Sequence, residues 1–167
     1  MLKVKEESIF ISENAANLLP RIDFADTFST TNRIHSIQEI TNQIFNTTPK
    51  LIAFLFKIRN SIVQFFGLKT TLPEDHHEEF KVGSYIKFFK IYDITPSEVI
   101  LGANDSHLNF RAIVSDTKVA SHNIKVTTLV EYNNKKGKIY MNLIKPFHRM
   151  VVKRMVSQAF QSPEKNN

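Results

Sequence analysis

The sequence predicts an α+β fold in which helices cover one face of a curved antiparallel sheet. Three observations lead to this prediction: two helical signals in the first half, four β-rich runs in the second half, and a long amphipathic segment at the end. Because the apolar side of a sheet and the apolar stripe of a helix must bury each other, this order places the final helix across the sheet.

Local capping signals define the two early helices. Ser36-Ile37-Gln38-Glu39 is a capping box, in which the serine oxygen and the glutamate carboxylate satisfy backbone donors at a helix start. This helix is expected to end near Thr47. Thr48 and Pro49 then suit the start of a second helix, and Gly67 suits its end, so residues 49–66 are predicted to be helical.

Five segments carry the pattern of strands. Residues 22–29 alternate partly between apolar and polar side chains, and four further runs are rich in β-branched and aromatic residues: 84–93, 97–103, 107–115 and 122–132. Asn104-Asp105 suits a two-residue turn between the second and third runs. Pairing across that turn would set Leu101 opposite Leu108 and Glu98 opposite Arg111.

The final segment, residues 137–161, is predicted to be one long helix. Its apolar positions recur at helical spacing, and its basic residues fall on the other side. The residues expected to face the core are Ile139, Tyr140, Leu143, Ile144, Phe147, Met150, Val151 and Met155. Pro146 lies inside the segment and lacks an N–H, so we expect the helix to be kinked there.

Length and composition bound the class of protein. A chain of 167 residues with 42% hydrophobic content reads as one domain, residues 1–167, with an ordered core at about 9–160. The absence of cysteine excludes disulfide scaffolds, thiol catalysis and Cys-ligated metal centres. The four glycines are not spaced as in a dinucleotide-binding loop or a P-loop. We therefore expect no cofactor.

The positive charge is concentrated at the end of the chain. The formal net charge is +6, and after Asn134 eight basic residues accompany a single acid, Glu164. This block suits either a solvated helix face or weak contact with a membrane surface or an acidic partner. No recognition motif for nucleic acid accompanies it. The charged N-terminus does not resemble a secretory signal, so a cytoplasmic location is expected.

The order of elements resembles the helix-grip superfamily of START, pollen-allergen-like and polyketide-cyclase domains. Four stretches also resemble the bacterial domain-of-unknown-function family 2867: Asp23-Phe24-Ala25-Asp26, Arg59-Asn60 through Phe66-Gly67-Leu68-Lys69, Leu101 through Arg111, and Pro146-Phe147-His148-Arg149. One departure is Asn109, where an acid is expected. The resemblance implies a sheet wrapped around the C-terminal helix with an internal cavity, and it implies no established activity.

Arg59 stands out among the charged residues because its helical neighbours at i±3 and i±4 are apolar. A guanidinium on an apolar face needs a carboxylate or an anionic ligand, because unpaired burial of a charge is costly. Two interpretations stay open: a structural pair with an acid such as Asp23, Asp26 or Glu98, or an anion-binding role.

Several further polar residues are candidates for lining a cavity. His107, Asn109 and Arg111 alternate on one strand, and Glu98 could neutralise Arg111, giving either an acid–base network or a surface ladder. His148 lies at the edge of the apolar stripe of the last helix. Thr128 and Tyr140 are expected to face inward with a polar tip each.

A metal site is not predicted. His76 and His77 lie among acids, but adjacent residues rarely converge on one ion, and the i, i+4 spacing of a helical zinc site is missing. The leading hypothesis is a non-catalytic protein that binds a small hydrophobic or amphipathic ligand between sheet and C-terminal helix, with Arg59, Glu98, His107, Arg111, Thr128, Tyr140 and His148 as candidate ligand-binding residues. The alternatives are a cyclase- or dehydratase-type enzyme using His107 or His148, and docking through the basic helix.

Overall fold

A computed structural model describes residues 3–46, 53, 57, 60 and 77–161 of the chain, and it has an α+β fold. Seven strands form one antiparallel sheet in the order β1-β2-β7-β6-β5-β4-β3. The predicted helix at residues 49–66 lies mostly outside the described residues. The strands are β1 (Lys5–Glu7), β2 (Phe24–Thr30), β3 (Tyr85–Ile86), β4 (Phe89–Ile94), β5 (Glu98–Asn104), β6 (Leu108–Asp116) and β7 (Ile124–Tyr132).

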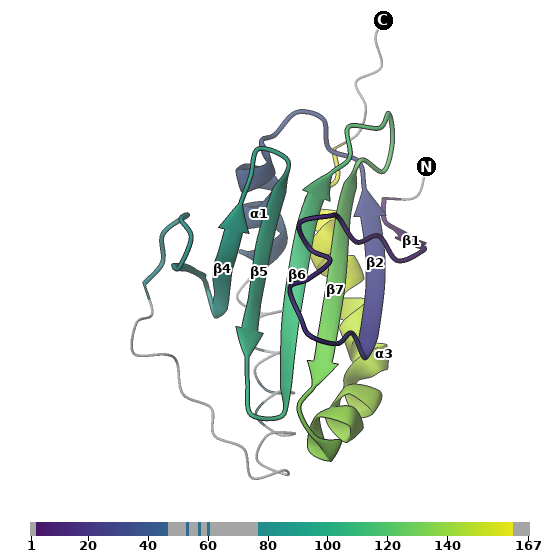
Figure 1. Cartoon of the computed structure of the whole chain (residues 1–167). Coiled ribbons are helices and arrows are strands. Elements are labelled where there is room, and N and C mark those ends of the chain that lie inside the picture. The colour runs from purple at the N-terminus through teal and green to yellow at the C-terminus, as the bar shows by residue number, and fades with distance from the viewer. Residues whose placement is uncertain (1–2, 47–52, 54–56, 58–59, 61–76, 162–167) are drawn as a thin grey trace, which may run out of the picture.

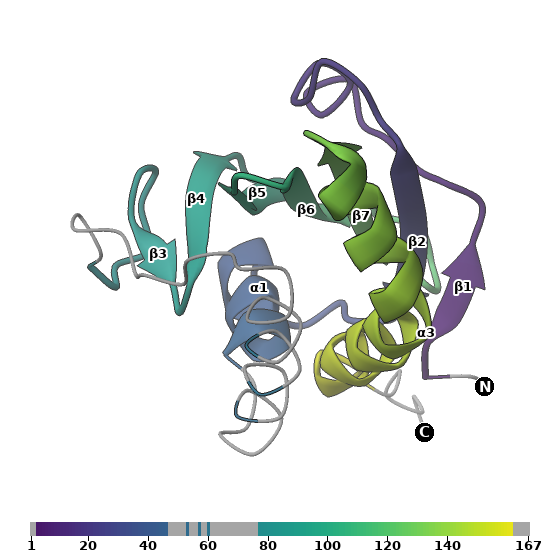
Figure 2. The same ribbon diagram turned by 90° about the horizontal axis from the view of Figure 1, so that it is seen from below.

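The two described helices, α1 (Ile37–Phe45) and α3 (Lys135–Gln158), lie on the same face of the curved sheet (Figures 1 and 2). We call this the inner face. Its core joins the sheet to both helices through Phe28, Leu101, Val114, Val126, Ile40, Ile44, Val151, Met155 and Val156, all buried. The predicted fold class, with a long C-terminal helix against a curved sheet, is confirmed.

Helix α1 begins at the predicted capping box. The Ser36 side chain accepts a hydrogen bond from the Glu39 N–H at 3.3 Å, and the Glu39 carboxylate accepts one from the Ser36 N–H at 2.8 Å. Two backbone donors that the first turn cannot satisfy are thereby paired. Ile37, Ile40 and Ile44 then fall on one side of the helix and pack on the inner face.

Helix α3 continues through Pro146, as predicted, and its axis changes direction near the middle (Figures 1 and 2). Its start is fixed by close backbone packing. Asn134 caps the helix by accepting from the Gly137 N–H at 3.1 Å. A Cβ at Gly137 would lie 1.9 Å from the carbonyl oxygen of His107, so only glycine lets the helix approach the β5–β6 turn this closely.

A second, smaller core lies on the opposite, outer face of the sheet. The segment between β1 and β2, residues 8–23, crosses that face (Figure 1), and we call it the strap. Ala15 and Leu19 of the strap bury against Ile100, Ile113 and Leu129. The strap backbone is also held at Phe10, whose N–H donates to Thr27 and whose carbonyl accepts from Thr127.

The register between β5 and β6 differs from the predicted one. Asn104 pairs with Asn109, and the Asp105 N–H donates to the Leu108 carbonyl at 2.9 Å, so the chain reverses at Ser106 and His107 rather than at Asn104 and Asp105. The later turn lengthens both strands and adds ladder hydrogen bonds. Each residue of β5 pairs with a residue of β6 four positions further along than predicted. Because four is an even number, every side chain stays on its predicted face of the sheet, but every cross-strand pair is different.

Gly137→Ala tests the close approach of α3 to the β5–β6 turn. In an unconstrained helix this change stabilises by about 0.5–1 kcal/mol. Here the added methyl meets a backbone carbonyl, so we expect the free energy of unfolding to fall by about 1–3 kcal/mol in urea denaturation.

Asn142→Ala, at an exposed position of the same helix, serves as the matched control and should change stability little. A Gly137→Ala protein that is more stable than wild type would contradict the packing described.

Candidate functional site

The structure distributes the predicted site residues over both faces of the sheet. Arg59 lies outside the described residues. Glu98 and Arg111 lie on the outer face, His107 lies in the β5–β6 turn beside Tyr140, and Thr128 and His148 lie on the inner face.

Glu98 does not neutralise Arg111, because the observed register sets Glu98 opposite Ser115. Its carboxylate is buried under the strap and accepts hydrogen bonds from Ser12 at 2.9 Å and Ser115 at 2.6 Å. Both oxygens of this acid are therefore satisfied by hydroxyl groups. The arrangement fastens the strap to the sheet.

Arg111 is a buried cation that stacks on an aromatic ring. It lies opposite Gly102, and its guanidinium carbon is 3.9 Å from the centre of the Tyr92 ring. Nη1 donates to Asn104 and to the Phe110 carbonyl, both at 2.8 Å. Burial lowers the pKa of this guanidinium from its ordinary value. These contacts hold the Arg111 side chain against the outer face of the sheet.

His107 does not share a face with Asn109 and Arg111, since it belongs to the turn and not to β6. Its buried ring packs edge-on against Tyr140 of α3, with 4.9 Å between ring centres. Its Nδ1 lies 3.5 Å from Asp105 Oδ1. His107 and Tyr140 thus join the β5–β6 turn to the first turns of α3.

On the inner face the structure brings His148 together with Asp26, an acid that was not among the predicted ligand-binding residues. Asp26 of β2 is paired in register with Thr128 of β7, and α3 crosses above them. His148 Nε2 lies 3.1 Å from Asp26 Oδ2, and the two side chains are only 18% and 8% exposed. We call these two residues the Asp26–His148 pair.

The hydrogen-bonding capacity of this pair is largely unused. Among the described residues, none forms a well-aligned hydrogen bond with either carboxylate oxygen of Asp26 or with His148 Nε2, although all three atoms are buried. Buried polar atoms are satisfied in most proteins, and an unsatisfied one costs about 1–3 kcal/mol. Glu98, the buried acid of the outer face, has no such deficit.

Aromatic and aliphatic groups surround the pair. The Phe24 ring meets His148 edge-on at 5.7 Å, and the Lys145 ammonium lies 5.0 Å from the centre of that ring. Ala112 is the next residue in register beyond Thr128. No group of three or more potential metal ligands occurs in the described part of the chain. The pair can act as a hydrogen-bonding centre or pass a proton between its two members.

The side of helix α3 that faces the sheet matches its pattern only in part. Val151 and Met155 are buried, and Tyr140 and Ile144 are partly buried, as expected. Ile139, Leu143, Phe147 and Met150, expected in the core, are 46–56% exposed. The basic residues lie toward the edge of the sheet, where Arg149 pairs with Glu6 and the Lys153 ammonium lies over the Phe28 ring. In the described residues no helix is long and apolar enough to span a membrane.

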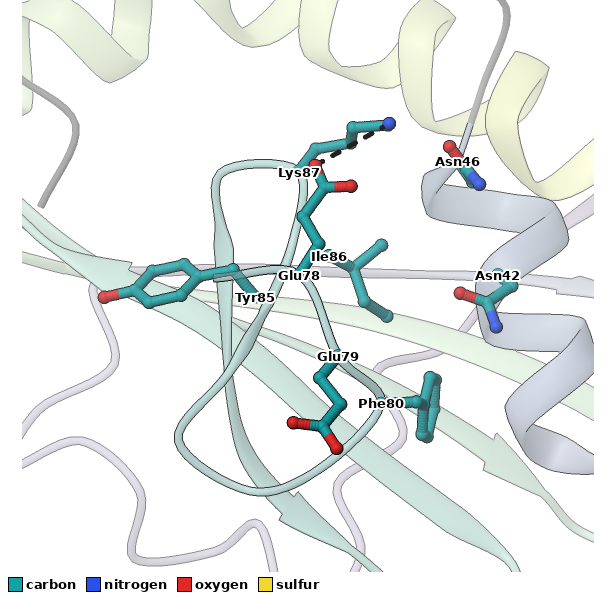
Figure 3. Close-up of a pocket in the computed structure, with 8 residues that line it drawn as sticks. All are labelled: Asn42, Asn46, Glu78, Glu79, Phe80, Tyr85, Ile86 and Lys87. Atoms are coloured by element: carbon teal, nitrogen blue, oxygen red, sulfur yellow. Dashed lines mark ion pairs between the residues drawn. The ribbon is translucent and has the colours of Figure 1, made fainter. Parts of the chain in front are cut away.

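A separate open pocket of about 200 Å³ lies between the end of α1 and the β3 region (Figure 3). Asn42 and Asn46 line one side, and Glu78 and Lys87, 3.7 Å apart, line the other. None of the predicted site residues contributes to this pocket. It therefore adds nothing to the site on the inner face.

Comparison with known proteins identifies the family. Residues 18–155 match the family model described as a protein of unknown function, DUF2867. The chain belongs to the DUF2867 family. No curated protein and no solved structure matches the chain. In this DUF2867 protein, Asp26 ends the Asp23-Phe24-Ala25-Asp26 motif and His148 lies in Pro146-Phe147-His148-Arg149, so the fold joins two stretches that are 122 residues apart in the sequence.

Asp26→Asn tests whether the pair serves stability. The change removes a buried carboxylate that has no well-aligned hydrogen bond among the described residues, so we expect the free energy of unfolding at pH 7 to rise by about 1 kcal/mol. Chemical denaturation measures it.

Glu98→Gln is the matched control, a buried acid with both oxygens satisfied, and it should lower stability by about 1 kcal/mol because charge-assisted hydrogen bonds become neutral ones. A loss of about 3 kcal/mol in Asp26→Asn, typical of a broken buried ion pair, would show that the pair is structural.

Proposed function

We propose that this protein binds a small amphipathic molecule whose apolar part lies along the inner face beside α3 and whose polar end meets the Asp26–His148 pair. The observation that carries the proposal is a buried acid and histidine on the face that holds the main apolar core. Their facing atoms have no well-aligned hydrogen bond among the described residues. Ligand sites commonly combine an apolar lining with a few polar groups that orient the ligand.

Half-buried aromatic rings support the apolar part of the site. Phe89 of β4 and Phe110 of β6 pack edge-on at 5.9 Å on the inner face, and both retain exposed surface. On α3, the side chains of Leu143 and Phe147 are 56% and 46% exposed. Burying such surfaces against a ligand contributes about 25 cal/mol per Å².

Two further candidate residues fit the same site. Thr128 lies beside Asp26 in the register, and Tyr140 lies on α3 about two turns before His148. A hydroxyl beside the carboxylate would help to orient a polar head group. The proposed location between the sheet and the C-terminal helix is the one that the helix-grip resemblance implies.

The same pair favours a second candidate function, an enzyme of cyclase or dehydratase type. A carboxylate that orients a histidine is a common acid–base arrangement, and here Asp26 faces Nε2, which leaves Nδ1 for proton transfer. Recovery of a chemically altered ligand after incubation would favour this candidate over simple binding.

Native mass spectrometry of freshly purified protein, followed by solvent extraction, tests the binding function. We expect a defined small-molecule adduct. In parallel, titration with the neutral apolar fluorophore N-phenyl-1-naphthylamine should give saturable binding that is about tenfold weaker in Leu143→Gln/Phe147→Gln, equivalent to about 1.4 kcal/mol.

The matched control for that titration changes the other flank of α3, in Lys138→Gln/Asn142→Gln, and should leave binding unchanged. All four positions are exposed, so neither double variant should unfold the protein. A clean unliganded mass together with no saturable binding would overturn the proposed function.

A further inference from the structure

We infer that the polar end of the ligand is a neutral hydroxyl, an alcohol or a phenol, rather than a carboxylate or an amine. This inference rests on the proposed function and adds the chemical class of the head group. It starts from the hydrogen-bonding needs of the Asp26–His148 pair.

Asp26 calls for a donor. An ionised carboxylate only accepts hydrogen bonds, and neither of its buried oxygens has a well-aligned donor among the described residues. A ligand hydroxyl supplies that donor. A ligand carboxylate would instead place a second anion within a few ångströms of Asp26, and like charges at that distance are strongly disfavoured.

The surrounding charges disfavour an ammonium group. Lys145 already places an ammonium against the Phe24 ring, the same ring that contacts His148. The Arg149 guanidinium is on the same helix and pairs with Glu6. Among the described residues, the titratable side chain that pairs with Asp26 is His148, 3.1 Å away. A neutral head group adds no further charge beside this pair.

A hydroxyl also matches the remaining polar atoms of the site, because it donates and accepts at once. Thr128 is directly opposite Asp26 in the antiparallel register, which places their Cβ atoms about 4.5–5.5 Å apart. A ligand oxygen that donates to Asp26 can accept from the Thr128 hydroxyl. A carboxylate cannot donate to Asp26, and an ammonium cannot accept from the Thr128 hydroxyl.

Helix α3 lacks one backbone hydrogen bond next to the pair. Pro146 precedes His148 by two residues and lacks the N–H that would bond to the Asn142 carbonyl. The axis of α3 changes direction near the middle of the helix (Figure 2).

Three ligands with the same chain and different head groups test the inference: 1-octanol, octanoate and octylamine. The affinity of each ligand is measured by its displacement of N-phenyl-1-naphthylamine from the protein at pH 7. Each ligand is kept below the concentration at which it aggregates. We expect 1-octanol to bind at least about tenfold more tightly than octanoate and octylamine. In the Asp26→Asn variant the side-chain amide can also donate a hydrogen bond. The affinity for octanoate should therefore rise relative to the affinity for 1-octanol.

Two variants separate the contributions. Thr128→Val keeps the shape of the side chain but removes its hydroxyl. It should weaken the binding of 1-octanol severalfold and have little effect on the binding of octylamine. Glu98→Gln should leave all three affinities unchanged. Circular dichroism verifies that each variant is folded.

Each outcome is decisive. Octanoate or octylamine binding as tightly as 1-octanol would overturn the head-group assignment and leave the proposed binding function standing. No displacement by any of the three, together with no binding of the fluorophore, would overturn both.

Discussion

The path of α3 across β2 and β7 is the constraint on which the site depends. Gly137 lets the helix begin against the His107 carbonyl, and Val151, Met155 and Val156 bury its second half in the inner core. Between these two anchors the helix has little freedom, and its middle turn sets His148 above Asp26. Packing at both ends thus brings a buried acid and a histidine together, although the described residues form no well-aligned hydrogen bond with their facing atoms.

The buried acids on the two faces of the sheet differ in their hydrogen bonding. On the outer face, Ser12 of the strap and Ser115 of β6 each donate a hydrogen bond to the Glu98 carboxylate. Both oxygens of this acid are satisfied, and the strap is held against the sheet. On the inner face Asp26 has only a contact with His148 among the described residues. The outer face shows that this fold can satisfy a buried carboxylate. The lack of a well-aligned hydrogen bond to Asp26 among the described residues supports the proposed binding role, because binding sites often reduce stability in exchange for function.

Local signals allowed much of the fold to be predicted, and long-range contacts account for what was missed. The capping box at Ser36, the strands and the continuous helix through Pro146 each depend on a few neighbouring residues. The strap carries no regular periodicity, and the turn at Ser106 competes with an equally suitable one at Asn104, so neither was predicted. The sequence pattern named His148 and Thr128, but Asp26 joined them only through the pairing of β2 with β7. The side of α3 that faces the sheet was predicted only in part, because apolar residues occur on two sides of the helix. Val151 and Met155 are buried as expected, whereas Leu143 and Phe147 are exposed.

A crystal structure of the protein with bound 1-octanol would show whether the Asp26–His148 pair is the polar centre of a binding site. We predict a ligand oxygen within hydrogen-bonding distance of an Asp26 carboxylate oxygen, with the octyl chain against Phe110 and the apolar side of α3. A ligand found instead in the open pocket beside Asn42 and Lys87, or on the outer face, would contradict the assignment of the Asp26–His148 pair as the polar centre of a binding site.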